Sequence, residues 1–196
     1  MSYVGIILTF VLVNNFVLTY FLGICPAIGA SRRVESSIGL GLAASILMAV
    51  AALLTWALRT WILLPLGLLF LQTFVFVLSI LALGYYLERL VETVAPALHR
   101  SVGKYLPTVS TNCVVLGIAL IAARSDFGPL ESLIAGVSAG GGFLLVMVIV
   151  STIREKLETE PVPRALRGVP IAFITTGLMA LALLAFDQAF LRNVVG

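Results

Sequence analysis

Residues 14–26 read Asn14-Asn15-Phe16-Val17-Leu18-Thr19-Tyr20-Phe21-Leu22-Gly23-Ile24-Cys25-Pro26, and they place two amides, a thiol and a helix-breaking Gly/Pro pair in an otherwise apolar segment. A second stretch, in the other half of the chain, repeats the arrangement as Ser110-Thr111-Asn112-Cys113-Val114-Val115-Leu116-Gly117. Each cysteine is followed at the fourth position by a glycine, Gly29 or Gly117. The rest of the sequence has to accommodate these two cysteine segments.

The composition indicates an integral membrane protein. Of the 196 residues, 61% are hydrophobic and 11% are charged, and the mean hydropathy is +1.15, which leaves too little polar surface to cover a soluble globule. Residues 1–13 lack the basic start and the cleavage site of a signal peptide, so we expect the N-terminus to stay as a membrane segment. The net charge of +3 lies in short loops. This pattern argues against nucleic acid as a partner and indicates membrane lipid as the surroundings.

Six apolar runs are long enough to cross a bilayer core, which needs about 20 residues per helix. They cover residues 3–24, 38–58, 66–87, 105–123, 132–153 and 169–186. The nine carboxylates fall in or beside the connections between these runs. The sequence therefore predicts an all-α membrane protein with six transmembrane helices.

The basic residues predict the orientation of the chain. If the N-terminus is outside, the cytoplasmic loops hold nine Lys and Arg residues, and the outer side holds three, Arg59, Arg124 and Arg192. By the positive-inside rule, both termini then lie on the outer side of the membrane. Trp56 and Trp61 bracket the outer ends of the second and third spans, where interfacial aromatic residues are common.

Short internal matches predict two inverted halves. Glu35-Ser36-Ser37-Ile38 matches Glu131-Ser132-Leu133-Ile134, and Phe70-Leu71-Gln72-Thr73 matches Phe173-Ile174-Thr175-Thr176. With the cysteine segments, these matches divide one membrane domain into residues 1–96 and 97–196, each with three spans. An odd number of spans turns the second copy upside down, and the functional elements of such repeats meet near the bilayer midplane.

Glycines in the second and fifth predicted spans indicate close helix packing, because a missing side chain lets the neighbouring backbone approach. These glycines are Gly39, Gly41, Gly136, Gly140, Gly141 and Gly142. A hinge or an ion path is the less favoured interpretation of the same residues.

Both thiols are expected at a similar depth in the membrane. Arg124 follows Cys113 by eleven residues, which is about 16 Å along a helix and about half of the hydrocarbon thickness. Pro26 argues against a continuous helix after Cys25, so an extended path brings this thiol to a comparable depth. The first and fourth spans are then broken or half-length. The polar side chains available to bond the freed backbone groups belong to Asn14, Asn15, Thr111 and Asn112.

The residues alone leave two interpretations of the cysteines open. Free cysteine packs as a small hydrophobic residue, so the two thiols need no function. Alternatively they bind a metal, but two cysteines 88 residues apart cannot supply four ligands within one chain, so the other ligands must come from elsewhere. The sequence contains no phosphate-binding glycine loop, nucleophile elbow or metal-binding His pair, and we assign no catalytic residue.

Several motifs, spread over nearly the whole chain, carry a resemblance to one family. They are Val13-Asn14-Asn15-Phe16-Val17-Leu18, Phe21-Leu22-Gly23-x-Cys25-Pro26, Leu64-Pro65-Leu66-Gly67-Leu68, Leu106-Pro107, Thr111-Asn112-Cys113-x-Val115-Leu116-Gly117, Ile153-Arg154-Glu155-Lys156-Leu157 and Ile174-Thr175-x-Gly177-Leu178-Met179. The chain resembles the RnfA (RsxA) family, the A-type membrane component of the bacterial Rnf (Rsx) ion-translocating electron-transport complex. It is also similar to NqrE, the related component of the sodium-pumping NADH:quinone oxidoreductase.

The resemblance implies a multi-pass subunit of the bacterial inner membrane, with both termini periplasmic. The complex passes electrons between reduced ferredoxin and NAD and couples this to sodium or proton movement. Cys25 and Cys113 would give two thiolates to one [2Fe-2S] cluster, and a homologous, oppositely oriented RnfE-like subunit would give the other two. The remaining Rnf subunits would carry the nicotinamide, flavin and ferredoxin sites. The supporting backbone near the cluster would include Asn14, Asn15, Gly23, Pro26, Thr111, Asn112 and Gly117.

Two other functions stay open at this point. Inverted repeats and broken helices are also features of small secondary transporters, although a charge inside the membrane is missing from the sequence pattern. The chain could also be a structural scaffold with incidental cysteines. Transport of a solute without a redox donor would favour the transporter, and normal turnover by a double cysteine mutant would favour the scaffold.

Overall fold

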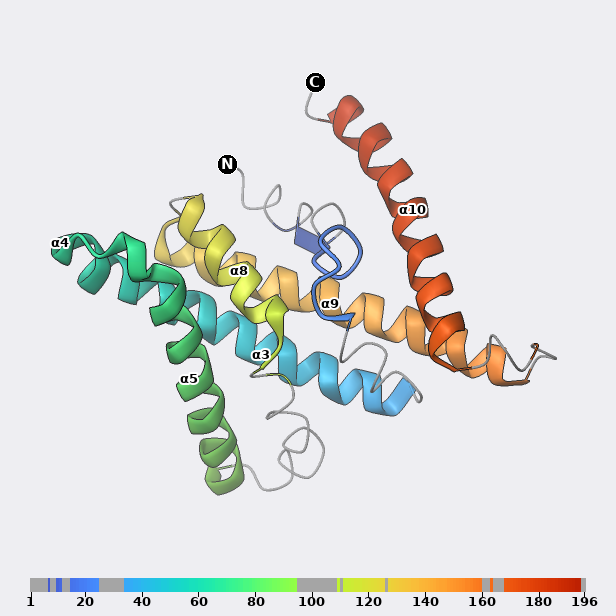
Figure 1. The fold of residues 1–196 in the computed structure, drawn as a ribbon, viewed down its shortest axis with the longest axis horizontal. Coiled ribbons are helices and arrows are strands. Elements are labelled where there is room, and N and C mark those ends of the chain that lie inside the picture. The colour runs from blue at the N-terminus through green and yellow to red at the C-terminus, as the bar shows by residue number, and fades with distance from the viewer. Residues whose placement is uncertain are drawn as a thin grey trace.

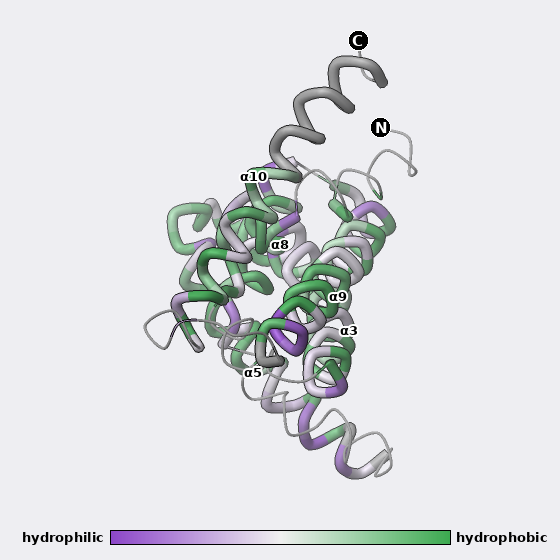
Figure 2. Tube along the Cα trace, turned by 90° about the vertical axis from the view of Figure 1, so that its right-hand side faces the viewer, coloured by the Kyte–Doolittle hydropathy of each residue, from purple (hydrophilic) through white to green (hydrophobic). Residues whose placement is uncertain are grey.

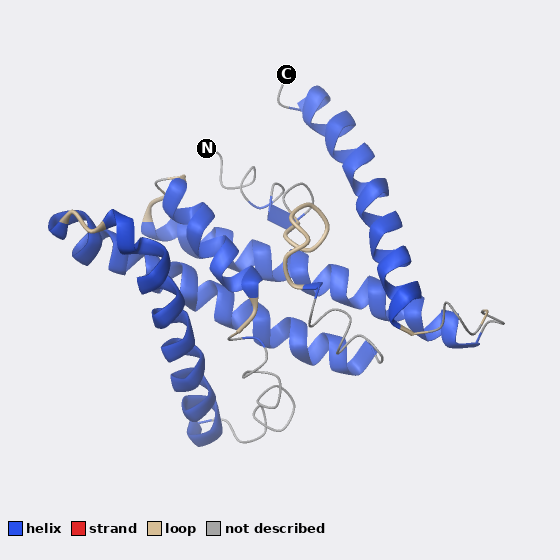
Figure 3. Cartoon of the chain, in the orientation of Figure 1, coloured by secondary structure: helices blue, strands red, loops and turns tan. Residues whose placement is uncertain are grey.

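The computed structural model describes residues 7, 10–11, 15–24, 34–94, 109, 111–125, 127–159, 163 and 168–194. Across these residues the chain forms helices joined by turns, and no strand occurs among them (Figure 3). The predicted all-α fold is therefore confirmed. Three of the residues singled out in the sequence, Asn14, Cys25 and Pro26, lie outside the described part.

The two helices α3 (Val34–Leu58) and α9 (Pro129–Thr159) form the centre of the molecule and lie side by side (Figure 1). They run antiparallel, since Gly41 approaches Leu144 whereas Gly136 approaches Met48. At the end of this contact, the Val34 N–H donates to Glu155 Oε1 at 3.4 Å. The pair provides the platform on which the remaining helices rest.

Glycines allow these two helices to approach closely. A Cβ atom added at Gly140 would lie 2.5 Å from Ser45 Cα, and one at Gly136 would lie 2.8 Å from the Met48 carbonyl oxygen. Such distances are shorter than atoms can tolerate, so both positions require glycine. The predicted role of Gly41, Gly136 and Gly140 in close packing is confirmed, whereas Gly141 faces open space.

The α3 helix continues beyond its predicted end. A π-helical turn η2 (Arg59–Leu63) and a short α4 (Leu64–Leu66) follow without a break, and the helix stops at Gly67, whose φ is 67°. This left-handed conformation suits glycine and is a common helix end. The sequence predicted a connection around Arg59, and that detail is wrong, because the helical backbone continues through η2 and α4 up to Gly67.

The other described helices pack around the central pair. A 3-10 turn η3 (Leu69–Leu71) leads into α5 (Gln72–Val94), the short α8 (Cys113–Arg124) lies against α3, and α10 (Val169–Val194) contacts α9. In Figure 1, α5 and α10 run at a steep angle to the central pair, α5 from near one end of the pair and α10 from near the other. The 12-residue α8 begins at the cysteine, as expected for a half-length fourth span.

Three apolar helical segments in the described part are long enough to span a membrane: Val34–Leu66, Leu69–Leu90 and Pro129–Leu157. They correspond to the predicted second, third and fifth spans. The segments Cys113–Arg124 and Val169–Ala182 are apolar but shorter. This is the architecture of a multi-pass all-α membrane protein.

Helix α5 shows the surface expected of such a protein. Within the most apolar 18 residues of the segment Leu69–Leu90, only 17% are buried, whereas 56% are buried in the corresponding stretch of Pro129–Leu157. Large apolar side chains such as Phe74, Leu78 and Tyr85 are exposed along it, and Figure 2 shows that hydrophobic residues cover much of the described chain. Apolar surface of this extent would be unstable in water and is stable against lipid tails or a partner helix.

Candidate functional site

The start of α8 holds Cys113 in a defined position. Asn112 is the N-cap of this helix, with extended backbone angles, and its Oδ1 accepts a hydrogen bond from the Val114 N–H at 3.2 Å. Asparagine is among the best N-cap residues, since its side chain replaces a bond that the first turn lacks. Cys113 is the first helical residue, and its side chain is exposed. The sulfur therefore lies at the positive end of a helix and is accessible from outside the chain.

The segment from Asn15 to Ile24 is a compact turn instead of a regular helix. The Thr19 N–H donates to the Asn15 carbonyl at 2.8 Å, and the Leu22 N–H donates to the Phe16 carbonyl at 2.9 Å. Phe21 has a φ of 52°, which is unusual for a residue with a side chain. The first apolar run is therefore broken here, as the sequence predicted, and the break carries local strain.

The turn packs directly on the start of α8. The Gly23 N–H donates to Cys113 Sγ at an N···S distance of 3.2 Å. Gly117, one turn further along α8, faces the same segment, because an added Cβ would lie 2.8 Å from Leu22 Cδ2. The structure therefore brings together Gly23, Asn112, Cys113 and Gly117, four of the residues singled out in the sequence.

Gly23 is required both by its backbone angle and by its surroundings. Its φ is 84°, and an added Cβ would lie 2.5 Å from Val114 Cγ2 and 2.9 Å from Phe143 Cε2. We expect Gly23→Ala to lower the free energy of unfolding by about 2 kcal/mol, because it combines left-handed backbone strain with overpacking. Thermal unfolding of the detergent-solubilised protein measures this.

Gly67→Ala is the matched control, since Gly67 also has a positive φ but has nothing within 4 Å of an added Cβ. In this variant the free energy of unfolding should fall only by the cost of the left-handed backbone strain, about 1 kcal/mol. Equal losses in the two variants would contradict the tight contact at Gly23.

Asn15 fixes the turn to the middle of α9. Its side chain is 3% exposed, and Nδ2 donates to the Gly142 carbonyl at 3.0 Å and to the Val11 carbonyl at 3.3 Å. Its Oδ1 accepts from the Val17 N–H at 3.2 Å. The prediction that polar side chains bond the backbone groups freed by the break is confirmed for Asn15 and Asn112. Thr111 is exposed and precedes the cap.

One polar atom beside Cys113 has no partner in the described structure. Asn112 is only 6% exposed, and its Nδ2 atom is buried without a hydrogen-bond partner. A buried amide donor without an acceptor costs about 1–3 kcal/mol. The Gly23 N–H is the donor that contacts the sulfur, whereas the Asn112 atom that faces the sulfur is the acceptor Oδ1, at 3.7 Å from Sγ.

The described residues do not complete a metal site. No group of three or more His, Cys, Asp or Glu side chains comes together in the parts of the chain that the structure describes. Cys113 is a single exposed thiol there, and Cys25 lies outside those parts. Any metal bound at Cys113 would therefore need ligands in addition to those described.

Two contributors to this site were not anticipated. The Gly142 carbonyl accepts a hydrogen bond from Asn15 Nδ2, and the Phe143 side chain limits the space beside Gly23. The glycine run 140–142 was the signal in the sequence, but the sequence could not show which segment it faces. A Cβ at Gly142 would lie 3.0 Å from the Phe10 carbonyl oxygen, so this glycine admits the first segment.

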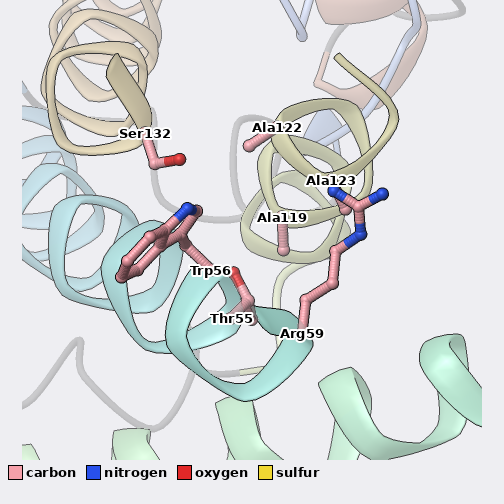
Figure 4. A pocket seen from close by; sticks show the side chains of 7 residues that line it. All are labelled: Thr55, Trp56, Arg59, Ala119, Ala122, Ala123 and Ser132. Carbon is pink, nitrogen blue, oxygen red and sulfur yellow. The ribbon is translucent and has the colours of Figure 1, made fainter. Parts of the chain in front are cut away.

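A small pocket lies at the other end of α8, between α3, α8 and α9 (Figure 4). Its lining residues are Thr55, Trp56, Arg59, Ala119, Ala122, Ala123 and Ser132. The cavity has a volume of about 10 Å³, which is room for roughly one water molecule. Ser132 Oγ is buried without a hydrogen-bond partner among the described residues. The pocket suits a bound water and is too small for a substrate.

The fold and the site together define a class of protein, a multi-pass helical membrane protein with a broken first segment. In this segment the Gly23 N–H donates a hydrogen bond to the thiol of Cys113 at the N-terminus of α8. A family model described as "Rnf-Nqr subunit, membrane protein" matches residues 3–189. The chain belongs to this Rnf-Nqr family of membrane subunits.

Curated relatives are similar over nearly their full length. The chain is 45% identical to the A-type subunit of the Na(+)-translocating ferredoxin:NAD(+) oxidoreductase complex of Acetobacterium woodii, over 95% of this chain and 97% of the relative. It is 46% identical to the A-type subunit of the ion-translocating oxidoreductase complex of Serratia proteamaculans, over 90% of this chain and 91% of the relative. A protein of the same description from Citrobacter koseri is also 46% identical, over 90% and 92%.

Proposed function

We propose that this chain is the A-type membrane subunit of an ion-translocating ferredoxin:NAD oxidoreductase complex, a redox-driven translocase. One observation carries the proposal. The chain is 45–46% identical to proteins described as the A-type component of such complexes, over at least nine-tenths of their length. The three apolar helices of membrane-spanning length in the described part of the chain suit a membrane component of such a complex. The coupling ion would be sodium or protons.

The part of this subunit in electron transfer would depend on its two cysteines. Cys113 and Cys25 would hold two corners of a [2Fe-2S] cluster, which supplies one-electron transfer when bound. Cys113 supports this role because its sulfur is exposed and accepts a hydrogen bond from the Gly23 N–H. A backbone donor at the sulfur suits the negative charge of a thiolate.

The partner would be a homologous subunit of opposite orientation, of the RnfE type, together with the other Rnf subunits. Four thiolates are needed, and this chain has two cysteines in all. The exposed position of Cys113 would let a neighbouring protein of the complex reach its sulfur. Both termini would lie on the periplasmic side of the inner membrane, as the distribution of basic residues indicates.

The inverted repeat is part of the same proposal. Helices α3 and α9 would be the second spans of the halves 1–96 and 97–196. Elements related by an inverted repeat run in opposite directions, and the antiparallel contact of Gly41 with Leu144 and of Gly136 with Met48 supports this relation. Asn15 and Asn112 add support, because each caps the N–H two residues further along the chain.

The proposal predicts ion transport that depends on electron transfer. Proteoliposomes containing the purified complex should take up sodium or protons when reduced ferredoxin and NAD are both present. We expect no uptake when either is omitted, because this subunit would move ions only as part of the redox cycle. Ion-selective fluorescent dyes measure uptake, and NADH absorbance measures the electron transfer. Uptake of equal rate without ferredoxin would overturn the proposal and favour a secondary transporter.

A further inference from the structure

Ser132 carries a buried hydroxyl that has no hydrogen-bond partner among the described residues. The residue lies in the first turn of α9 and is fully buried, and only its backbone N–H is bonded, to the Gly128 carbonyl at 2.9 Å. Buried polar side chains in native proteins are rarely left without a partner, and each exception calls for a specific explanation, such as a bound water or ion. The question is which molecule completes the hydrogen bonding of Ser132.

Three other hydroxyls of the two central helices bond within their own helix. Ser45, Thr55 and Thr152 each donate to the carbonyl four residues earlier, at 2.8 Å. This bond is the usual solution for a serine or threonine inside a helix. Ser132 does not form it, although the Gly128 carbonyl is in the corresponding position. The Ser132 hydroxyl is therefore directed away from its own helix.

The hydroxyl points into the small pocket between α3, α8 and α9 (Figure 4). Helix α8 leaves this space open, because it contributes only the methyl groups of Ala119, Ala122 and Ala123, which share one face at three- and four-residue spacing. The cavity volume of about 10 Å³ matches one water molecule. The space is thus large enough for a single small occupant next to Ser132.

Thr55 offers an acceptor to the same occupant from α3. The residue is 1% exposed, and its hydroxyl donates its only proton to the carbonyl groups of Ala51 and Ala52, at 2.8 and 3.2 Å. A hydroxyl oxygen keeps two lone pairs, so Thr55 Oγ1 can still accept a hydrogen bond from a molecule in the pocket. Arg59 also lines the pocket and brings donor groups to it. Two to four polar partners of this kind are typical for a buried water.

We propose that this pocket binds one ordered water molecule, which accepts a hydrogen bond from Ser132 Oγ and donates one to Thr55 Oγ1. The inference does not depend on the proposed function. The competing occupant is a small anion attracted by the charge of Arg59, but Thr55 presents only lone pairs to the pocket, and these repel an anion and attract a water proton. The bound water links α9 to α3 and stabilises their packing beside α8.

The direction of one stability change tests the bound water. Ser132→Ala removes the hydroxyl without adding volume, so the water loses a partner and α9 loses its link to α3. We expect the melting temperature of the full-length protein in detergent to fall by about 2–4 °C, the shift for one lost hydrogen bond in a chain of this size. An empty pocket predicts the opposite change, because the variant would then remove an unsatisfied buried hydroxyl. An unchanged or higher melting temperature would overturn the inference.

Ser151→Ala is the matched control. Ser151 is also a fully buried serine on α9 whose hydroxyl has no partner among the described residues, but it does not line this pocket. We expect its melting temperature to equal or exceed that of the wild type, because alanine relieves the unsatisfied hydroxyl and favours helix. Equal changes in the two variants would show that the pocket adds nothing at Ser132 and would overturn the inference.

A high-resolution crystal structure of the wild-type protein covers the case in which Ser132→Ala fails to fold. Its electron density should show one water within hydrogen-bond distance of Ser132 Oγ and Thr55 Oγ1. An empty pocket, in a map that resolves other buried waters, would overturn the inference. Crystals grown in bromide separate the two occupants, since a water gives no anomalous signal. An anomalous peak in the pocket would identify a halide site and would also overturn the inference.

Discussion

Replacing Cys113 with alanine in the intact complex is expected to abolish the signal of the proposed iron–sulfur cluster and to stop the proposed electron transfer between ferredoxin and NAD. Alanine removes a thiolate that no nearby described side chain can replace, since no group of three potential metal ligands occurs in the described parts. A cluster of this type requires four thiolates, so the loss of one corner should release about two iron atoms and two sulfides per complex. Iron and acid-labile sulfide assays, with electron paramagnetic resonance, measure the loss. Cys25→Ala should give the same result.

The matched control for this experiment is Thr152→Ala. Thr152 is exposed on α9, about three helical turns from Gly142, where this helix meets the site. It should retain iron, sulfide and turnover. Full iron content and a normal signal in Cys113→Ala would refute the ligand assignment, and normal turnover by the double cysteine variant would favour the scaffold interpretation.

Replacing Gly140 with leucine should separate the two central helices. An added Cβ alone would lie 2.5 Å from Ser45 Cα and 2.7 Å from Ser45 Cβ, so the clash involves backbone and cannot be relieved by rotating a side chain. We expect the free energy of unfolding to fall by about 3 kcal/mol or more, at the upper end of overpacking effects. Association of membrane helices depends on close packing, which makes this contact especially sensitive. Thermal unfolding in detergent measures the change.

Gly141→Leu provides the control for this prediction. The neighbouring Gly141 lies on the same helix but has nothing within 4 Å of an added Cβ. The substitution should leave the protein as stable as the wild type or stabilise it by about 0.5–1 kcal/mol, because leucine favours helix more than glycine does. A similar loss in both variants would mean that the helix tolerates neither change, and it would contradict the α3–α9 register.

Much of the fold could be predicted because hydropathy in a membrane chain depends on local sequence. The predicted spans 38–58, 66–87 and 132–153 correspond to helical segments of the structure, and the short fourth span follows from the distance between Cys113 and Arg124. The error at Arg59 arose because charge was taken to end the helix. The helix in fact ends at Gly67, where the backbone adopts a left-handed conformation.

The candidate site could be predicted in its residue types but not in its contacts. A glycine before one cysteine and asparagines in both segments indicated irregular backbone with polar side chains to satisfy it. The sequence could not distinguish Gly140, which touches Ser45, from Gly141, which touches nothing. Which face of a helix meets a neighbour depends on the rotation of both helices, and adjacent glycines look alike in a sequence.

The sequence by itself determined that this chain is an all-α membrane protein of the Rnf-Nqr family, with its polar and helix-breaking residues gathered around two cysteines. Only the tertiary structure decided that the Gly23 amide meets Cys113 Sγ, across 90 residues, and that Asn15 bonds to the Gly142 carbonyl, across 127 residues. Hydrophobicity and backbone preferences act over a few residues, so they are visible in a sequence. A hydrogen bond between distant segments exists only once packing has fixed their separation to within a fraction of an ångström.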